Sequence, residues 1–247
     1  MEVHHHPIAI GSHHGKKKWT EYFWEFLMLF LAVTLGFFVE NQREHYVEHQ
    51  RATEYAQQMY DDLKEDTFLY NKLVGWIDEH LKSFDTVNML FGQTPPVSNK
   101  RLISALLPMR TTYPFHPKTT TFNQMKSSGT LRYFRNKEIS KRVIEYYDVF
   151  HAHLRVAFDY ADKFFTTDVQ SFMLNHFDYN ESAYFGDTLK VDNPTYLDRS
   201  PKTDMLLRNR MILYCSILKY IVDTPIRAAQ KRVIILMEQL KKEYHLD

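Results

Sequence analysis

The chain has 247 residues, of which 44% are hydrophobic and 25% charged. This is the composition of a folded protein, and it excludes collagen-like, mucin-like and low-complexity chains. The 31 basic and 30 acidic residues nearly cancel, so the net charge gives no argument for a nucleic-acid partner. The single cysteine excludes an intrachain disulfide framework and a cysteine-rich zinc site. With only 7 glycines the chain has few positions suited to tight turns, which favours long helices.

A targeting signal lies near the N-terminus. Three lysines at 16–18 precede an aromatic and apolar run over 19–39, of which residues 26–39 carry no charge. At ~1.5 Å per residue a helix over 19–39 is about 31 Å long, close to the thickness of the hydrocarbon core. We therefore predict one transmembrane helix. Two alternatives stay open: a cleaved signal peptide, although no small-x-small cleavage site follows, and an amphipathic helix, because Glu21 and Glu25 interrupt the run.

The basic residues next to this helix predict its orientation. The lysines lie directly before it, whereas Arg43 and Arg51 on the other side are interspersed with glutamates. Because the cytoplasmic side of a span carries the excess of Lys and Arg, we expect a His- and Lys-rich cytoplasmic arm over 1–18. Residues 40–247 are then expected outside a bacterial inner membrane, in the periplasm.

Beyond the span the apolar residues recur at helical spacings of three and four. The first such stripe comprises Ala52, Tyr55, Ala56, Met59, Leu63, Tyr70, Leu73, Ile77, Leu81, Phe84, Val87 and Phe91. No proline lies between Trp19 and Gly92, so we predict that the membrane helix continues into this stripe, with Asp66-Thr67 and Gly75 as weak candidate breaks. We interpret the acids at 61, 62, 65 and 66 as its polar face.

Shorter helices and turns follow. Gly92 and the prolines after it end the first helix, a short helix is expected over 100–107, and another over 121–128 is closed by Gly129. Asn136 is expected to cap a long helix. Its stripe comprises Ile139, Val143, Tyr147, Phe150, Leu154, Phe158, Ala161, Phe165, Val169 and Phe172.

The C-terminal part is predicted as a polar loop over 178–202 and a last helix. Thr203-Asp204 is expected to start this helix, and Thr224-Pro225 either to kink it or to restart it. Alternation of the strand type is nearly absent. The fold class that we predict is therefore all-α: one N-terminal transmembrane helix that continues into a single antiparallel helical bundle.

Two stretches carry a resemblance to known sequences. The opening Met-Glu-Val-His-His-His-Pro, with the later run Glu-Phe-Leu-Met-Leu-Phe-Leu-Ala-Val-Thr-Leu-Gly-Phe at 25–37, resembles uncharacterised bacterial single-pass membrane proteins. Residues 121–132, with 135–138 and 144–147 behind them, are similar to the recurring motif of a large bacterial family of unknown function. The resemblance implies a short N-terminal tail, one membrane helix and a helical extracytoplasmic domain. It brings no activity, cofactor or catalytic residue.

One face of the predicted span is a candidate for helix association. Glu25, Leu29, Ala32 and Gly36 are spaced by four, three and four, so they share a face, on which Ala32 and Gly36 form a small-xxx-small pair. An acid within a membrane often marks pairing with a partner or proton handling. The alternative is that Glu25 simply extends to the interface beside the lysines.

Two groups of histidines are candidate ligands for a transition metal. His4, His5 and His6 lie in the N-terminal arm, and a flexible His-rich arm binds Zn, Ni or Cu weakly; an engineered tag is an alternative origin. His45 and His49 lie at i, i+4 on one helix face, without a third ligand that the sequence identifies. A solvated helix face is the alternative for this pair.

The corner around Gly129 is a second candidate site. Lys126, Ser127, Ser128 and Arg132 offer a cationic and hydroxyl-rich set for a ligand or a partner. The alternative is a purely structural corner, made by a glycine C-cap and an asparagine N-cap.

The motifs that identify enzymes are missing: there is no Gly-rich phosphate loop, nucleophile elbow or HExxH motif. We therefore expect no catalytic residue and no cofactor; a hydrolase whose site matches none of these motifs is the alternative. The function predicted is that of a non-enzymatic accessory subunit or interaction module of a membrane assembly, with other membrane-protein subunits or further copies of the chain as partners. The alternative is an extracytoplasmic ligand-binding or sensor module, in which the loop 178–202 and the aromatic bundle hold a ligand.

Overall fold

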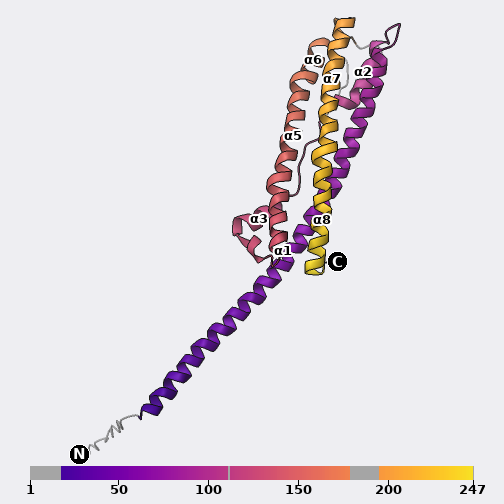
Figure 1. Cartoon of the computed structure of the whole chain (residues 1–247). Helices are drawn as coiled ribbons and strands as arrows, with labels where there is room; N and C mark the ends of the chain where they lie inside the picture. Colours follow the sequence, from indigo (N-terminus) through magenta and orange to yellow (C-terminus); the bar gives the residue numbers. More distant parts are fainter. Residues whose placement is uncertain (1–17, 111, 179–194, 247) are drawn as a thin grey trace, which may run out of the picture. The chain divides into compact units, whose positions relative to one another are not determined.

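The computed structural model describes residues 18–110, 112–178 and 195–246 (Figure 1). In this part of the chain the regular elements are helices, and the only strand-type pairing is an isolated antiparallel bridge between Phe177 and Tyr196. The all-α prediction is therefore confirmed. The chain divides into two compact units, residues 1–50 and 51–247.

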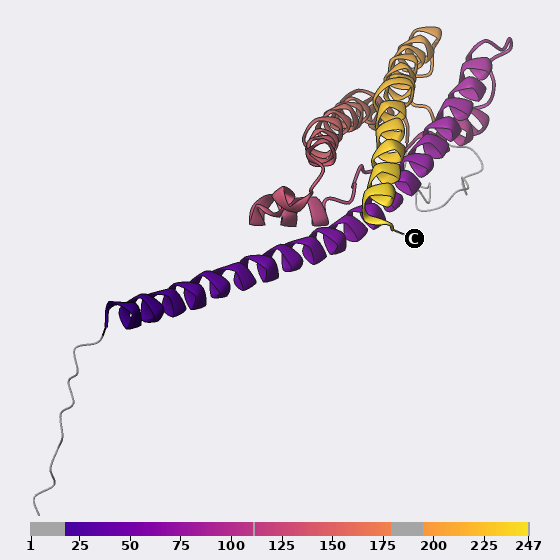
Figure 2. The same cartoon turned by 60° about the horizontal axis from the view of Figure 1, so that its bottom comes forward.

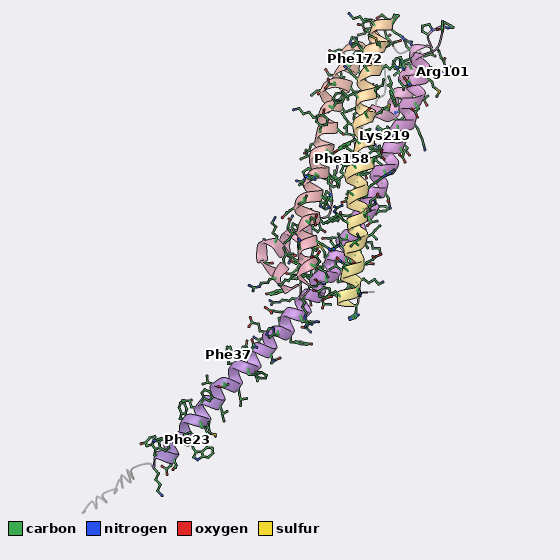
Figure 3. The ribbon with its side chains drawn as sticks, in the orientation of Figure 1. Phe23, Phe37, Arg101, Phe158, Phe172 and Lys219 are labelled. Carbon is green, nitrogen blue, oxygen red and sulfur yellow. The ribbon has the colours of Figure 1, made fainter. Side chains whose placement is uncertain are left out.

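Helix α1, Trp19–Phe91, contributes to both units. The continuity that the sequence predicted is confirmed, because neither Asp66-Thr67 nor Gly75 interrupts it. In the first unit most of its apolar side chains are exposed, as Phe23 and Phe37 illustrate in Figure 3. Its most apolar 18-residue window has a mean hydropathy of 1.9 and none of it is buried. By length and composition this segment is able to cross a membrane.

The described residues of the second unit form three long helical stretches. The first is the part of α1 from Arg51 onward. The second runs through α4 (Lys137–Ile144), η3 (Glu145–Phe150), α5 (His151–Phe164), η4 (Phe165–Gln170) and α6 (Ser171–His176). The third runs through α7 (Pro201–Ile221), η5 (Val222–Ile226) and α8 (Arg227–Tyr244).

Contacts between these stretches give their directions. Asn88 accepts a hydrogen bond from Arg208, and Asn71 accepts one from Gln230, so the third stretch is antiparallel to α1. The third stretch is also antiparallel to the second, because Arg210 lies over Phe172 whereas Arg232 lies over Phe150. The first and second stretches therefore run in the same direction.

The connection between the parallel stretches has to return along the length of the unit. It comprises α2 (Asn99–Leu106), η1 (Leu107–Arg110), α3 (Thr120–Ser128) and η2 (Thr130–Tyr133). In Figures 1 and 2, α2 lies beside the end of α1 and α3 lies near the start of the second stretch. This return brings α3 against the middle of α1, where the candidate site described below lies.

Three π-helical segments, η3, η4 and η5, interrupt the long stretches, and the core pattern explains their positions. At each one the buried residues recur at two successive spacings of four: Val143, Tyr147 and His151; Ala161, Phe165 and Val169; Leu218, Val222 and Ile226. A straight α-helix has 3.6 residues per turn, so each step of four overshoots the core by about 40°. A wider π turn absorbs the extra residue and keeps the set on one face.

The helix ends agree in part with the sequence. Gly129, at φ 70°, closes α3, and Asn136 caps α4 by accepting a hydrogen bond from the Glu138 N–H, as predicted. The predicted start at Thr203-Asp204 is wrong. Ser200 is the N-cap of α7, with a reciprocal capping box to Thr203 and a proline at the first helical position.

Of the two alternatives for Thr224-Pro225, a kink or a restart of the helix, the restart is wrong. The chain does not restart there, since Pro225 lies inside the π segment η5 and the helix runs on into α8. Proline cannot donate the hydrogen bond that a regular α-helix requires of it. A π turn in which the bonding pattern already shifts is therefore a position where it is tolerated.

Candidate functional site

A carboxylate buried in the middle of the second unit is the centre of the candidate site. Asp66 of α1 has an exposed fraction of 0%, which corrects its interpretation as part of a polar face. It occupies a core position in the series Met59, Leu63, Asp66 and Tyr70, whose other members are apolar or aromatic and equally buried. A buried carboxylate is costly unless it is hydrogen-bonded or paired.

Three groups from distant parts of the chain approach this carboxylate. The Lys118 backbone N–H donates to Oδ1 at 2.9 Å, and the Tyr146 hydroxyl donates to Oδ2 at 2.8 Å. Nε2 of His151 lies 3.2 Å from Oδ2, but neither ring nitrogen of His151 forms an aligned hydrogen bond within the described residues. His151 and Asp66 are therefore in close contact without an aligned hydrogen bond between them.

The hydrogen bonds continue one step beyond Asp66. The hydroxyls of Tyr70 and Tyr146 lie 2.8 Å apart. Because the Tyr146 proton is directed to Asp66, the Tyr70 hydroxyl has to be the donor in this pair. The result is a directed chain of hydrogen bonds, in which Tyr70 donates to Tyr146 and Tyr146 donates to Asp66, and it links α1 to η3.

Aromatic rings enclose this cluster. The His151 ring has edge contacts with Tyr146 at 4.5 Å and with Tyr147 at 4.8 Å between centroids. Phe115 stacks on Phe158 at 5.4 Å and meets the edge of His151 at 6.0 Å. These rings exclude water, which strengthens each polar contact inside them.

The π segment η3 makes this arrangement possible. Tyr146 and Tyr147 are adjacent in sequence and both are buried, at 1% and 5% exposure. In a regular α-helix Tyr147 would point about 100° away from Tyr146. His151, four residues after Tyr147, would point still further away from Tyr146. The wider turn directs all three toward α1, and π segments of this kind are frequent at functional sites.

The protonation of the tyrosines follows from their burial. Burial is the largest effect raising the pKa of Tyr70, of Tyr146 and of Tyr147 above the ordinary value, and the negative charge of Asp66 adds to it. All three therefore remain neutral at physiological pH. The neutral hydroxyl of Tyr146 can donate to Asp66, whereas the hydroxyl of Tyr147 has no hydrogen-bond partner in the described part of the chain.

A second acid one turn earlier fixes α3 to α1. Asp62 accepts a hydrogen bond from the Thr121 N–H at 3.2 Å. The N-cap residue of α3, Thr119, makes no side-chain cap, so Asp62 supplies from another helix the acceptor that the first turn of α3 needs. Lys118 reinforces the contact through an ion pair with Glu65 at 3.0 Å.

The predicted site around Gly129 is a well-satisfied corner. The Ser127 and Ser128 hydroxyls donate to the Gln124 carbonyl at 3.1 and 2.7 Å, and Lys126 pairs with Asp148 at 2.7 Å. Arg132 lies over the Tyr133 ring at 5.4 Å. Each member therefore has an intramolecular contact that accounts for its position.

The predicted metal ligands are not brought into a cluster by the described residues. His4, His5 and His6 lie outside those residues. Nδ1 of His45 is 3.9 Å from Glu48, and His49 also has a contact of its own. Among residues 18–110, 112–178 and 195–246, no group of three or more His, Cys, Asp or Glu side chains is placed to hold a metal ion.

The predicted association face lies in the first unit. Leu29 is 68% exposed, and a Cβ atom placed on Gly36 would meet no atom within 4 Å. Glu25, Leu29, Ala32 and Gly36 are all α1 residues of the first unit, where they are exposed.

Comparisons of the chain with protein-family models, with curated proteins and with solved structures find no match. The functional reasoning therefore depends on the residues themselves. Sequence reasoning missed Asp66 and His151, although the spacing contained a signal for both. Each falls on the buried face of its helix, where a polar residue indicates a paired internal group.

Proposed function

We propose that this chain is a single-pass protein of a bacterial inner membrane whose helical outer domain acts as an interaction module or accessory subunit of a membrane assembly. The observation that carries the proposal is the exposed apolar surface of residues 19–39. A core helix of a water-soluble protein buries such residues, whereas none of the apolar window of α1 is buried. The resemblance to bacterial single-pass proteins supports the same location.

The continuity of α1 favours an uncleaved span over a signal peptide. The helix passes from the apolar run through Glu40 and Arg43, which form an ion pair, and on into the second unit. A signal peptide requires small residues at a cleavage site after its apolar region. The sequence Glu40-Asn41-Gln42-Arg43 does not provide them.

The lysines at 16–18 support a cytoplasmic N-terminus, because positive charge is retained on that side. On this orientation the second unit faces the periplasm. An association through the span would use the face with Glu25, Ala32 and Gly36, where small side chains let another helix approach closely.

Purification of the full chain in mild detergent, with mass spectrometry of the intact assembly, tests this proposal. We expect either copies of the chain or other membrane proteins to accompany it. Gly36→Ile should reduce the assembly, because the added side chain blocks close approach of the helices. Thr34→Ile adds bulk to the opposite face of the same helix and should leave the assembly unchanged. A lone monomer in the unmodified chain would contradict the interaction role.

A further inference from the structure

A cationic cleft opens between the second and third stretches of the bundle. Its walls come from α4, the start of η3 and the middle of α8, and its cavity volume is about 430 Å³. This lies within the range of about 300–1,000 Å³ that is usual for sites of small molecules. The cleft is distinct from the corner at Gly129 and from the association face of the first unit.

The charges that line the cleft are predominantly positive. Lys141 and Arg142 of α4 face Lys231 and Arg232 of α8. The acids in the cleft are Glu138 and Glu145; Glu138 is already engaged by the Arg142 guanidinium, Nε to Oε1, at 3.0 Å. Positive charge therefore exceeds negative charge by two formal units, which suits a dianion.

Both arginines are held in place without a ligand, Arg142 by its bond to Glu138 and Arg232 by two contacts within the bundle. The Arg232 guanidinium lies 3.6 Å from the centroid of the Phe150 ring, and its Nη1 donates to the Ala228 carbonyl at 3.2 Å. A guanidinium has five N–H donors in a rigid fork, and this bond uses one of them. Because the side chain is already ordered, little further conformational entropy is lost when an anion binds.

The remaining walls are apolar and aromatic. Leu236 and Tyr146 are buried residues that the cleft reaches, and Ile235 is 43% exposed beside them. The ligand that fits this lining has an anionic group that contacts the lysines and arginines, and an apolar or flat portion that packs against Ile235. Tyr146 also donates to Asp66, so a ligand in the cleft would lie beside one member of the hydrogen-bonded cluster.

We propose that this cleft binds a small phosphomonoester, with Lys141, Lys231 and Arg232 on the phosphate. A phosphomonoester carries about −1.5 to −2 charges at neutral pH and three strong acceptor oxygens, which match the charge excess and the donors of the cleft. This binding activity goes beyond the interaction role proposed above. Its failure would leave that role untouched.

The test is isothermal titration of the full chain in nonionic detergent with phenyl phosphate, which combines a phosphate dianion with a flat apolar group. The double variant Lys141→Gln/Lys231→Gln should raise Kd by about tenfold or more, because it removes two charge-assisted contacts. Both lysines are exposed, so the double variant should fold. The matched control is Lys163→Gln/Lys219→Gln, which removes two exposed lysines outside the cleft and should leave Kd unchanged.

Two further probes sharpen the result. Phenol, which lacks the phosphate, should not bind measurably. Short-chain phosphatidic acid carries the same phosphomonoester on a lipid, and tighter binding of it than of phenyl phosphate would assign the ligand to lipids. The proposal is overturned if phenyl phosphate does not bind or if phenol binds equally well. It is also overturned if the two double variants raise the Kd for phenyl phosphate by the same factor.

Discussion

Tyr146 and Tyr147 are adjacent, similarly buried tyrosines for which loss of the hydroxyl should have opposite consequences. Tyr146→Phe removes the donor to Asp66 and the acceptor of the Tyr70 hydroxyl, whose exposed fraction is 0%. A hydrogen bond to a charged group contributes about 1.5–3 kcal/mol and a stranded buried donor costs about 1–3 kcal/mol, so we expect a loss of about 3–5 kcal/mol in the free energy of unfolding. Tyr147→Phe removes a hydroxyl without a partner in the described residues and should be neutral or stabilising.

Tyr70→Phe completes the comparison. It removes the first donor of this series of hydrogen bonds but leaves Tyr146 bonded to Asp66. The free energy of unfolding should therefore fall by only about 1 kcal/mol. In the double variant Tyr70→Phe/Tyr146→Phe no donor is stranded. The double loss should therefore be smaller than the sum of the single losses by about 2 kcal/mol, within the usual range for residues of one network.

Urea unfolding of the full chain in nonionic detergent, followed by near-UV circular dichroism, measures these differences. In a thermal scan a loss of 3 kcal/mol corresponds to a lower Tm by about 6–12 °C for a domain of this size. Equal losses for Tyr146→Phe and Tyr147→Phe would refute the directed chain from Tyr70 to Asp66. A loss of unfolding free energy in Tyr70→Phe/Tyr146→Phe that equals the sum of the two single losses would refute it as well.

Three further predictions concern other parts of the second unit. Burial raises the pKa of the Cys215 thiol from 9.0 to about 12, so the thiol ionises first in the unfolded chain. The stability that Cys215 contributes should be intact below about pH 9 and fall by up to ~1.4 kcal/mol per pH unit as the pH rises toward 12. Urea unfolding measures this contribution as the difference in slope between the unmodified chain and Cys215→Ala, because the buried tyrosines lose stability of their own at high pH. Gly129→Ala should cost about 1–2 kcal/mol from the left-handed backbone alone, because a Cβ there meets no atom within 4 Å; a neutral result would contradict the assigned φ of 70°. Ser200→Ala should cost about 1 kcal/mol by loss of the α7 capping box, measured as a lower Tm, while Ser216→Ala on the exposed face of α7 serves as its control.

The elements that local chemistry determines could be predicted from the sequence. An unbroken helix over Trp19–Phe91, the glycine cap at Gly129 and the asparagine cap at Asn136 each depend on residues within a few positions of one another. The start of α7 was misplaced although its signal is equally local. Serine followed by proline at the first helical position is a stronger start than Thr203-Asp204.

The candidate site could be predicted only in part, because it depends on contacts between distant segments. Asp66 was assigned to the surface by residue type, while its spacing from Leu63 and Tyr70 placed it on the core stripe. His151 was missed for a related reason, since the stripe was continued through Phe150. The π segment turns Phe150 partly outward, under the Arg232 guanidinium, and brings His151 to Asp66.

The cationic cleft had no signal in the sequence, because Lys141-Arg142 and Lys231-Arg232 lie about ninety positions apart in the chain. Only the antiparallel pairing of the second and third stretches brings the two dipeptides together. The π segments, by contrast, had a readable signal. Successive spacings of four, as in Leu218, Val222 and Ile226, do not fit a straight α-helix.

Alkaline carbonate extraction of membranes from bacteria that express the full chain tests the central claim most directly. This treatment releases proteins held by charge and retains those with an inserted helix. If residues 19–39 span the membrane, the chain should stay in the membrane pellet at its full length. Release into the supernatant, or a chain shortened at the end of the apolar run, would contradict a single-pass membrane protein.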